Sequence, residues 1–169
     1  MTLLCGDYRT TAVYIPAETV QLVFCETSRP QEAEDAASVA ARILKPGGSF
    51  LCRCSHASLP TTLASAGKHL RYWWTLARVH GVHAIPASHD SLLSSHWEPV
   101  IWFVKGTRGD KQRFLVDLAT GDREAFARYY IDRLTCPGGH VVDLFGDRAT
   151  RRAAESIGRT WIGFAEAQS

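Results

Sequence analysis

The acid with the clearest chemical context in this sequence is Asp143, which lies near the end of an apolar run at residues 140–144. The pair Gly138 and Gly139 turns into this run, and a helical stretch rich in Ala and Arg follows it. Gly158 ends that stretch, and a second apolar run covers residues 160–164. The pattern predicts strand, loop, helix and strand. In open α/β sheets, the loop after the first strand of such a parallel unit is where cofactors bind.

The elements that must position this loop also alternate between strand and helix patterns. Apolar residues at helical spacing predict helices over 32–44, 61–79 and 123–134. Trp73 and Trp74 in the second are expected to pack in the core or against a helix, with base stacking as the alternative. Lys45-Pro46-Gly47-Gly48 should end the first helix, because proline cannot continue it and glycine supplies the reversal. Strands are predicted at 20–25, 49–54 and 99–104, with a weak one at 114–118 and an irregular stretch at 80–96. The alternation predicts a mostly parallel sheet with helices on both faces.

Length and composition indicate one ordinary globular domain. The chain has 169 residues, of which 46% are hydrophobic and 21% charged. No apolar run approaches the roughly 20 residues that span a bilayer, and the first residues lack the pattern of a signal peptide. We therefore expect a cytoplasmic protein with no membrane contact. Five cysteines, an odd number, argue against a disulfide framework.

Two clusters of basic residues stand out against a net charge of only +2. The first contains Lys105, Arg108, Lys111 and Arg113, and the second contains Arg148, Arg151, Arg152 and Arg159. Both could be solvated surface charges, or both could contact phosphates of a nucleic acid.

Metal binding is not expected. Cys52, Cys54 and His56 alternate at strand spacing and would share one face, but no second ligand pair has the spacing of a zinc site. Four histidines between residues 80 and 96 fit no familiar ligand set.

The segment TCPGGHVVDLFGDRATRRAAESIGRTWIGFAEAQ resembles the cofactor motif of DNA amino-methyltransferases, which make N6-methyladenine or N4-methylcytosine with S-adenosylmethionine. Three further segments resemble other parts of that family in the same permuted order. They are Cys5-Gly6-Asp7 with Val20-Gln21-Leu22-Val23, the run AASVAARILKPGGSFL, and Trp97-Glu98-Pro99-Val100-Ile101-Trp102-Phe103-Val104-Lys105-Gly106. The resemblance implies a Rossmann-like methyltransferase fold over residues 1–169 in a single domain. It would hold a catalytic-loop half at 1–60, a short insert in the target-recognition position at 80–98, and a cofactor-loop half at 123–169.

At the catalytic loop the sequence departs from the family. Its D/N-PP-Y/F/W motif supplies an acid or amide for the target amine and an aromatic ring for the flipped base. Here Glu26, Thr27, Ser28 and Arg29 fall in those four positions. Glu26 keeps a carboxylate on a longer side chain, the two prolines are lost, and the guanidinium of Arg29 replaces the ring.

The cofactor loop departs as well. By the resemblance, Asp7, Asp143 and Phe145 would contact the cofactor, but the two glycines of FxGxG fall on Asp147 and Ala149. If the register slides by one residue, Gly146 takes one glycine role. Ala165 stands where the family places an acid for the ribose, and Glu166 follows it. S-adenosylmethionine is therefore a possible cofactor, but these changes argue against tight binding.

These departures favour a degenerate relative of the DNA amino-methyltransferases, one that methylates poorly and serves as a nucleic-acid-binding or regulatory partner. DNA is the expected partner, with a protein partner or homodimer as a further possibility. An active enzyme that uses Glu26 in an altered loop remains open. So does a protein-interaction module that binds neither DNA nor cofactor.

Overall fold

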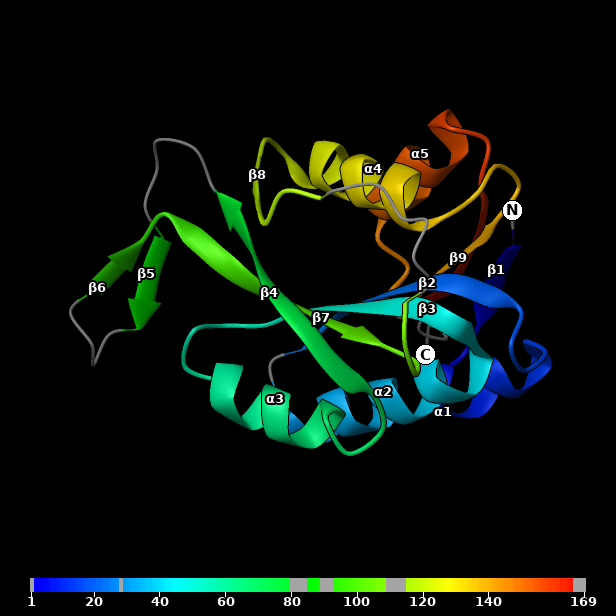
Figure 1. The fold of residues 1–169 in the computed structure, drawn as a ribbon, viewed down its shortest axis with the longest axis horizontal. Helices are drawn as coiled ribbons and strands as arrows, with labels where there is room; N and C mark the ends of the chain where they lie inside the picture. The colour runs from blue at the N-terminus through cyan, green and yellow to red at the C-terminus, as the bar shows by residue number, and fades with distance from the viewer. Residues whose placement is uncertain (1, 28, 80–84, 89–92, 109–114, 166–169) are drawn as a thin grey trace.

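The computed structural model describes every residue of the chain except 1, 28, 80–84, 89–92, 109–114 and 166–169 (Figure 1). Its strands are β1 (Thr2–Cys5), β2 (Val20–Glu26), β3 (Leu44–Arg53), β4 (Arg71–Val79), β5 (Ile85–Ser88), β6 (Leu93–Ser95), β7 (Trp97–Val104), β8 (Leu118–Thr120), β9 (His140–Asp143) and β10 (Thr160–Ala165). Its helices are α1 (Tyr8–Thr11), the 3₁₀ turn η1 (Ala12–Tyr14), α2 (Pro30–Ile43), α3 (Leu59–Ala66), α4 (Arg123–Leu134) and α5 (Arg148–Ser156).

Eight of the strands form one sheet in the order β1-β10-β9-β2-β3-β7-β4-β8. The first five strands of this order run parallel to one another, and β7 is antiparallel to both β3 and β4. Helices α4 and α5 lie over one face of the sheet, and α1, α2 and α3 lie over the other (Figure 1). The predicted α/β fold, a mostly parallel sheet covered on both faces, is confirmed.

Each face of the sheet carries its own buried core. Phe50 and Leu51 are neighbours in β3 and point to opposite faces, since side chains alternate along a strand. Phe50 packs with Phe103 on the side of α2, and Leu51 packs with Tyr130 on the side of α4. Burial on both faces explains why the central strands are nearly continuous apolar runs.

The predicted helix over 32–44 is confirmed as α2, which ends at Ile43. The strand begins at Leu44 and so includes the Lys45–Gly48 segment that we expected only to reverse the chain. Gly47 has a φ of 78°, and a Cβ on Gly48 would lie 2.8 Å from the carbonyl oxygen of Lys45. The two glycines therefore allow the chain to pass from helix to strand without a separate loop.

The predicted helix over 61–79 is wrong in its second half. Helix α3 ends at Ala66, and residues from Arg71 onward form strand β4, which pairs with β7. The sequence Tyr72-Trp73-Trp74-Thr75 consists of residues that favour strands, and an available partner strand decided the outcome. Trp73 and Trp74 are 36% and 53% exposed, so the expectation that they pack inside is also wrong.

The stretch at 80–96 is less irregular than expected. Within its described residues, β5 and β6 form an antiparallel pair that extends away from the main sheet (Figure 1). Of the weak strand expected at 114–118, only Leu118 lies in a strand among the described residues, at the start of β8 (Leu118–Thr120), beside the end of β4. Among the helices that the structure describes, none is both long and apolar enough to cross a membrane.

Candidate active site

Two loops meet at the edge of the sheet where the neighbouring strands β2 and β9 end. Phe24 pairs with Asp143 at this edge. From β9 the chain passes through α5 to β10 on one side, and from β2 it passes through α2 to β3 on the other. The strand order thus reverses between β9 and β2. Ligands of open α/β sheets bind at such a reversal, outside the carboxyl ends of the strands.

Asp143 organises the loop after β9. Its carboxylate is buried and accepts hydrogen bonds from the backbone N–H groups of Phe145 and Asp147, at 3.0 and 3.2 Å. Burial raises the pKa of Asp143 to about 6, because the two hydrogen bonds compensate only part of the desolvation. This carboxylate therefore holds the shape of its own loop.

Gly146 supplies the tight turn in this loop. Its φ is 64°, and a Cβ at this position would lie 2.2 Å from the carbonyl oxygen of Phe164 in β10. The glycine therefore serves a close approach of the loop to the next strand. The slid register, in which Gly146 takes a glycine role beside the cofactor, stays a prediction.

Asp147 and Ala149 do not take the place of flexible glycines. Asp147 has a φ of −62° and is the N-cap of α5, where its side chain accepts the N–H of Ala149 at 3.0 Å. Ala149 lies within the first turn of that helix. The loop thus uses a carboxylate to satisfy one of the N-terminal amides that an anionic ligand could otherwise bind.

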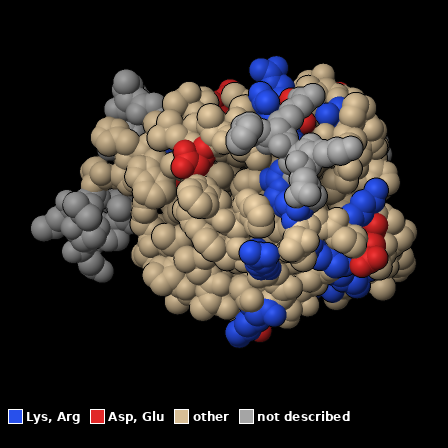
Figure 2. All heavy atoms as spheres, in the orientation of Figure 1, with Lys and Arg blue, Asp and Glu red and all other residues tan. Residues whose placement is uncertain are grey.

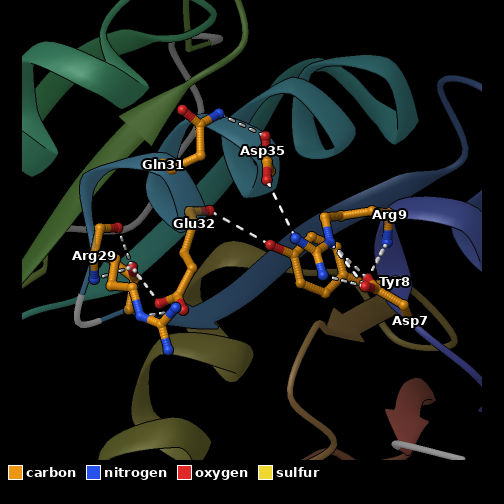
Figure 3. A network of polar contacts seen from close by, with 8 residues as sticks. Asp7, Tyr8, Arg9, Arg29, Gln31, Glu32 and Asp35 are labelled. Carbon is orange, nitrogen blue, oxygen red and sulfur yellow. Dashed lines mark hydrogen bonds and ion pairs between the residues drawn. The ribbon is translucent and has the colours of Figure 1, made fainter.

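The loop after β2 is closed by its own hydrogen bonds. Thr27 is buried, and its hydroxyl donates to the carbonyl oxygen of Arg29 at 2.8 Å. The guanidinium of Arg29 forms an ion pair with Glu32 at 3.3 Å, and the two side chains point toward each other in Figure 3. The carboxylate of Glu32 also lies 3.3 Å from the Thr27 hydroxyl. Ser28, the remaining residue of the predicted catalytic loop, lies outside the described residues.

A chain of alternating charges joins these two loops. Arg123, the first residue of α4, lies 3.7 Å from Asp147 and 3.7 Å from Glu26. Glu26 also pairs with Arg53, at the end of β3.

The same chain continues toward the sheet interior. Arg53 lies 2.8 Å from Glu98 at the start of β7, and Glu98 pairs in turn with Arg78 of β4. Three acidic and three basic side chains thus alternate in space from the loop after β9 to β4, the third strand beyond β2 in the sheet.

The charged chain lines a small pocket at this edge. The pocket has a volume of about 70 Å³, and Phe24, Leu51, Phe126 and Asp143 contribute to its wall. Sites for small-molecule ligands usually enclose roughly 300–1,000 Å³. In the present arrangement, the space between the two loops is therefore narrow for a ligand.

Asp7 lies beside the same edge but is engaged locally. Its side chain caps α1 by accepting the N–H of Arg9, and it also forms an ion pair with the Arg9 guanidinium (Figure 3). The hydrogen bond from Arg9 holds the pKa of Asp7 below its usual range. The ring of Tyr8 lies 5.9 Å from that of Phe145, and its hydroxyl donates to the backbone oxygen of Glu32 at 3.4 Å. Tyr8 therefore connects the predicted cofactor residues to α2. Glu166 lies outside the described residues.

The basic residues predicted to contact nucleic acid lie on several different elements. Lys105 pairs with Glu18 at 2.9 Å, at the edge of the sheet where β2 begins. Arg148 begins α5, at the edge where β9 ends. On that helix Arg151 pairs with Glu155, and Arg152 pairs with Glu124 at 4.0 Å. Lys105 and Arg148 therefore lie at opposite edges, and Lys111 and Arg113 are outside the described residues.

The cysteines are not arranged for metal binding. Within the part of the chain that the structure describes, no group of three or more His, Cys, Asp or Glu side chains could hold an ion. Cys25 and Cys54 are buried, and burial raises the pKa of the Cys54 thiol to about 12. His56 instead lies 2.9 Å from the backbone oxygen of Trp97.

The sequence interpretation missed the residues that fill the site, Arg53, Arg78, Glu98 and Arg123. A signal for three of them was present, because each is an ionisable residue inside or at the end of an apolar strand run. Such a residue needs a partner when the strand is buried. The partner itself comes from another strand and is not visible in the local pattern.

Comparison with known proteins gives a clear result only at the level of structure. No protein-family model matches this sequence, and no curated protein matches it. A putative DNA modification methylase from Thermus thermophilus, TTHA0409, superimposes with a TM-score of 0.77 at 18% identity, over 98% of this chain and 89% of that one. M1.HpyAVI gives a TM-score of 0.79 at 14% identity, over 99% and 92% of the two chains.

The cytosine-N4-specific PvuII DNA methyltransferase gives a TM-score of 0.77 at 17% identity, over 98% of this chain and 81% of that one. Structures of TTHA0409 and M1.HpyAVI in complex with S-adenosylmethionine are similar as well. The chain therefore has the fold of DNA methyltransferases, as the resemblance implied.

Proposed function

We propose that this chain is a degenerate relative of the DNA adenine-N6 and cytosine-N4 methyltransferases. In this proposal it is catalytically impaired and acts as a nucleic-acid-binding or regulatory partner. The fold common to this chain and DNA methyltransferases supports the relationship. The way in which the two candidate loops are closed supports the loss of activity.

The observation that carries the proposal is the position of Arg123. One guanidinium lies within 3.7 Å of both Glu26 in the catalytic loop and Asp147 in the cofactor loop. A group that accepts a hydrogen bond from a substrate amine needs an available lone pair about 3 Å from that amine. Both Arg53 and Arg123 contact the Oε2 atom of the Glu26 carboxylate, so a substrate amine would meet a carboxylate whose charge is already balanced by two cations.

The residues present do not suit S-adenosylmethionine. The carboxylate of Asp147 occupies the N-terminus of α5, where the carboxylate of a cofactor would otherwise find backbone N–H groups. Like charges at this position repel. The pocket between the loops, at about 70 Å³, is also too small for a ligand of this size. We therefore derive no reaction step through the cofactor.

The position whose aromatic ring stacks on the flipped base in the DNA amino-methyltransferases is also changed. Arg29 replaces the aromatic residue, and its side chain is held by Glu32 at 3.3 Å. A guanidinium can stack on a base, but here it would have to leave its carboxylate first.

Nucleic-acid binding would rest on the basic residues at the surface. Arg148 follows the cofactor loop directly, whereas Arg151 and Arg152 are each paired with an acid. Binding should be weakly sequence-dependent and should weaken as salt rises, because each neutralised phosphate releases counterion.

An active enzyme with an altered loop is the second candidate. Its support is the exposure of the Glu26 side chain, 52%, which leaves that carboxylate accessible from solvent. A partner that drew Arg123 away would leave the Glu26 carboxylate paired with Arg53 alone.

Calorimetric titration with S-adenosylmethionine, followed by a tritium-transfer assay on duplex and single-stranded DNA, tests the proposal. We expect S-adenosylmethionine to bind more weakly than with a micromolar dissociation constant, or not at all, and we expect no transfer of label to the DNA. Glu26→Gln is the matched variant, since it removes the charge and keeps the shape. Label incorporation that Glu26→Gln abolishes would identify a working enzyme and refute the proposal.

A further inference from the structure

Two tryptophans at the start of β4 form an exposed aromatic surface that the proposed function does not use. Trp73 and Trp74 are 36% and 53% exposed, although tryptophan is largely buried in most proteins. We name this surface the tryptophan platform and define it as Trp73, Trp74 and the two arginines beside them, Arg71 and Arg108.

A β-bulge puts both indole rings on the same face of the sheet. Tyr72 pairs with Phe103 and Trp74 pairs with Trp102, so Trp73 is an extra residue in the strand. The ring of Trp73 lies 6.3 Å from that of Trp102, on the face that carries the α4 core. In a regular strand the two side chains would point to opposite faces.

Two cations lie against these aromatic rings. The guanidinium of Arg71 lies 5.6 Å from the centroid of Trp73, and that of Arg108 lies 4.4 Å from the centroid of Trp102. Neither arginine pairs with a carboxylate among the residues that the structure describes. Burial lowers the pKa of Arg108 to about 10, which leaves it charged at neutral pH.

The surroundings of the platform also favour an anionic partner. Figure 1 shows β4 crossing in front of β7, so Figure 2 looks onto the β4 side of the molecule. In this view basic side chains cover more of the surface than acidic ones (Figure 2). One acid is close by, Asp117, which accepts a hydrogen bond from the Trp74 indole at 3.3 Å.

A second copy of the chain fits the platform less well. Within the described residues β8 pairs with β4 only from Ala77 to Val79, so the first half of this edge could add a strand. Such strand addition would use the backbone groups of the β4 edge and would leave the indole rings and arginines of the platform, which lie on the face of the sheet, without a partner.

We propose that the tryptophan platform binds single-stranded nucleic acid, with bases stacked on Trp73 and Trp74 and phosphates paired with Arg71 and Arg108. Aromatic rings beside cations are the general means by which proteins bind single strands without reading their sequence. A duplex keeps its base faces stacked internally and offers only its phosphates. The inference does not depend on the proposed function, because β3 and β7 separate β4 from β2 and the candidate loops lie at the ends of β2 and β9.

Fluorescence anisotropy with a labelled twelve-nucleotide oligothymidylate, compared with a duplex of equal length, tests this inference. We expect the protein to prefer the single strand and its intrinsic tryptophan emission to be quenched on binding. The double variant Trp73→Ala with Trp74→Ala should lose affinity about tenfold or more and lose the quenching. Arg71→Ala should reduce the salt dependence of binding.

Trp97→Ala is the matched control. Trp97 is 37% exposed but lies at the start of β7, where it packs edge-on against His56. Its removal should leave binding unchanged. If the double alanine variant does not fold, as judged by circular dichroism, then Trp73→Phe with Trp74→Phe should retain most of the affinity and Trp74→Ala alone should lose part of it.

Three results would overturn the inference. The first is an absence of single-strand binding at low salt, and the second is binding that the double alanine variant does not weaken. The third is a dimer in sedimentation experiments that the double alanine variant dissociates, which would assign the platform to self-association.

Discussion

Replacing Glu98 by glutamine should destabilise the protein far more than the same replacement at Glu26. Both carboxylates pair with Arg53, so the two variants remove the same chemical group from one network. They differ in burial, since the side chain of Glu98 is 15% exposed and that of Glu26 is 52% exposed. The contrast therefore isolates the effect of the environment on an ion pair.

The size of each expected loss of stability follows from the charges that the substitution leaves without a partner. Glu98→Gln leaves Arg53 and Arg78 without the carboxylate between them, and their side chains are 19% and 10% exposed. Removing one partner of a buried ion pair costs about 3–5 kcal/mol. The loss for Glu98→Gln should be at the lower end, about 3 kcal/mol, because the amide oxygen of glutamine still accepts a hydrogen bond. An exposed pair contributes about 0–1 kcal/mol, which sets the loss for Glu26→Gln. In a protein of this size each kcal/mol lowers the melting temperature by about 2–4 °C.

Thermal unfolding followed by circular dichroism at pH 7 measures both variants. We expect a decrease of about 6–12 °C for Glu98→Gln and of at most about 4 °C for Glu26→Gln. The double variant should lose more than the sum, because Arg53 then has neither acid. Equal losses for the two single variants would refute the reasoning that burial decides the strength of this network.

The pH dependence provides a second measurement of the same residue. Burial opposes ionisation of Glu98, but the hydrogen bonds from Arg78 and Arg53 outweigh it and hold its pKa below the usual range. A carboxylate whose pKa is lower in the folded state stabilises fully above its unfolded pKa of about 4.3 and loses that effect as the pH falls. The difference in stability between the wild type and Glu98→Gln should therefore shrink below about pH 4.

Two further predictions concern the loop after β9. Burial raises the pKa of Asp143 to about 6. Ionisation of this carboxyl therefore destabilises the fold by about 3 kcal/mol as the pH rises from about 4 to 7, and Asp143→Asn should remove that loss. Urea unfolding at both pH values checks this, and an unchanged difference between the wild type and the variant would contradict it. Gly146→Ala should destabilise by about 2 kcal/mol or more, since a Cβ would lie 2.2 Å from the Phe164 oxygen at a φ of 64°. The same urea titration measures it, and a loss below about 0.5 kcal/mol would show that the loop can relax.

Much of the scaffold could be predicted from the sequence because the relevant signals are local. The apolar runs that became β2, β7, β9 and β10 and the helical spacing of α2 and α4 lie in single stretches of chain. Strands that are buried on both faces leave a strong apolar signature. The resemblance to DNA amino-methyltransferases also arose from such stretches, including the Lys45–Gly48 segment.

The prediction failed where the local pattern was ambiguous and tertiary pairing decided the structure. The segment from Arg71 to Val79 has aromatic residues at a spacing that fits either structure, and pairing with β7 made it a strand. The bulge that places Trp73 and Trp74 together depends on the register of that pairing. No local pattern specifies such a register.

The sequence by itself determined which residues are predicted for the catalytic and cofactor positions, because their order along the chain follows the motifs. Only the tertiary structure decided what those residues do. Asp147 caps a helix, and Glu26 pairs with arginines from β3 and α4, elements that are distant in sequence. An ion pair depends on distance in space, and the fold alone brings these charges together.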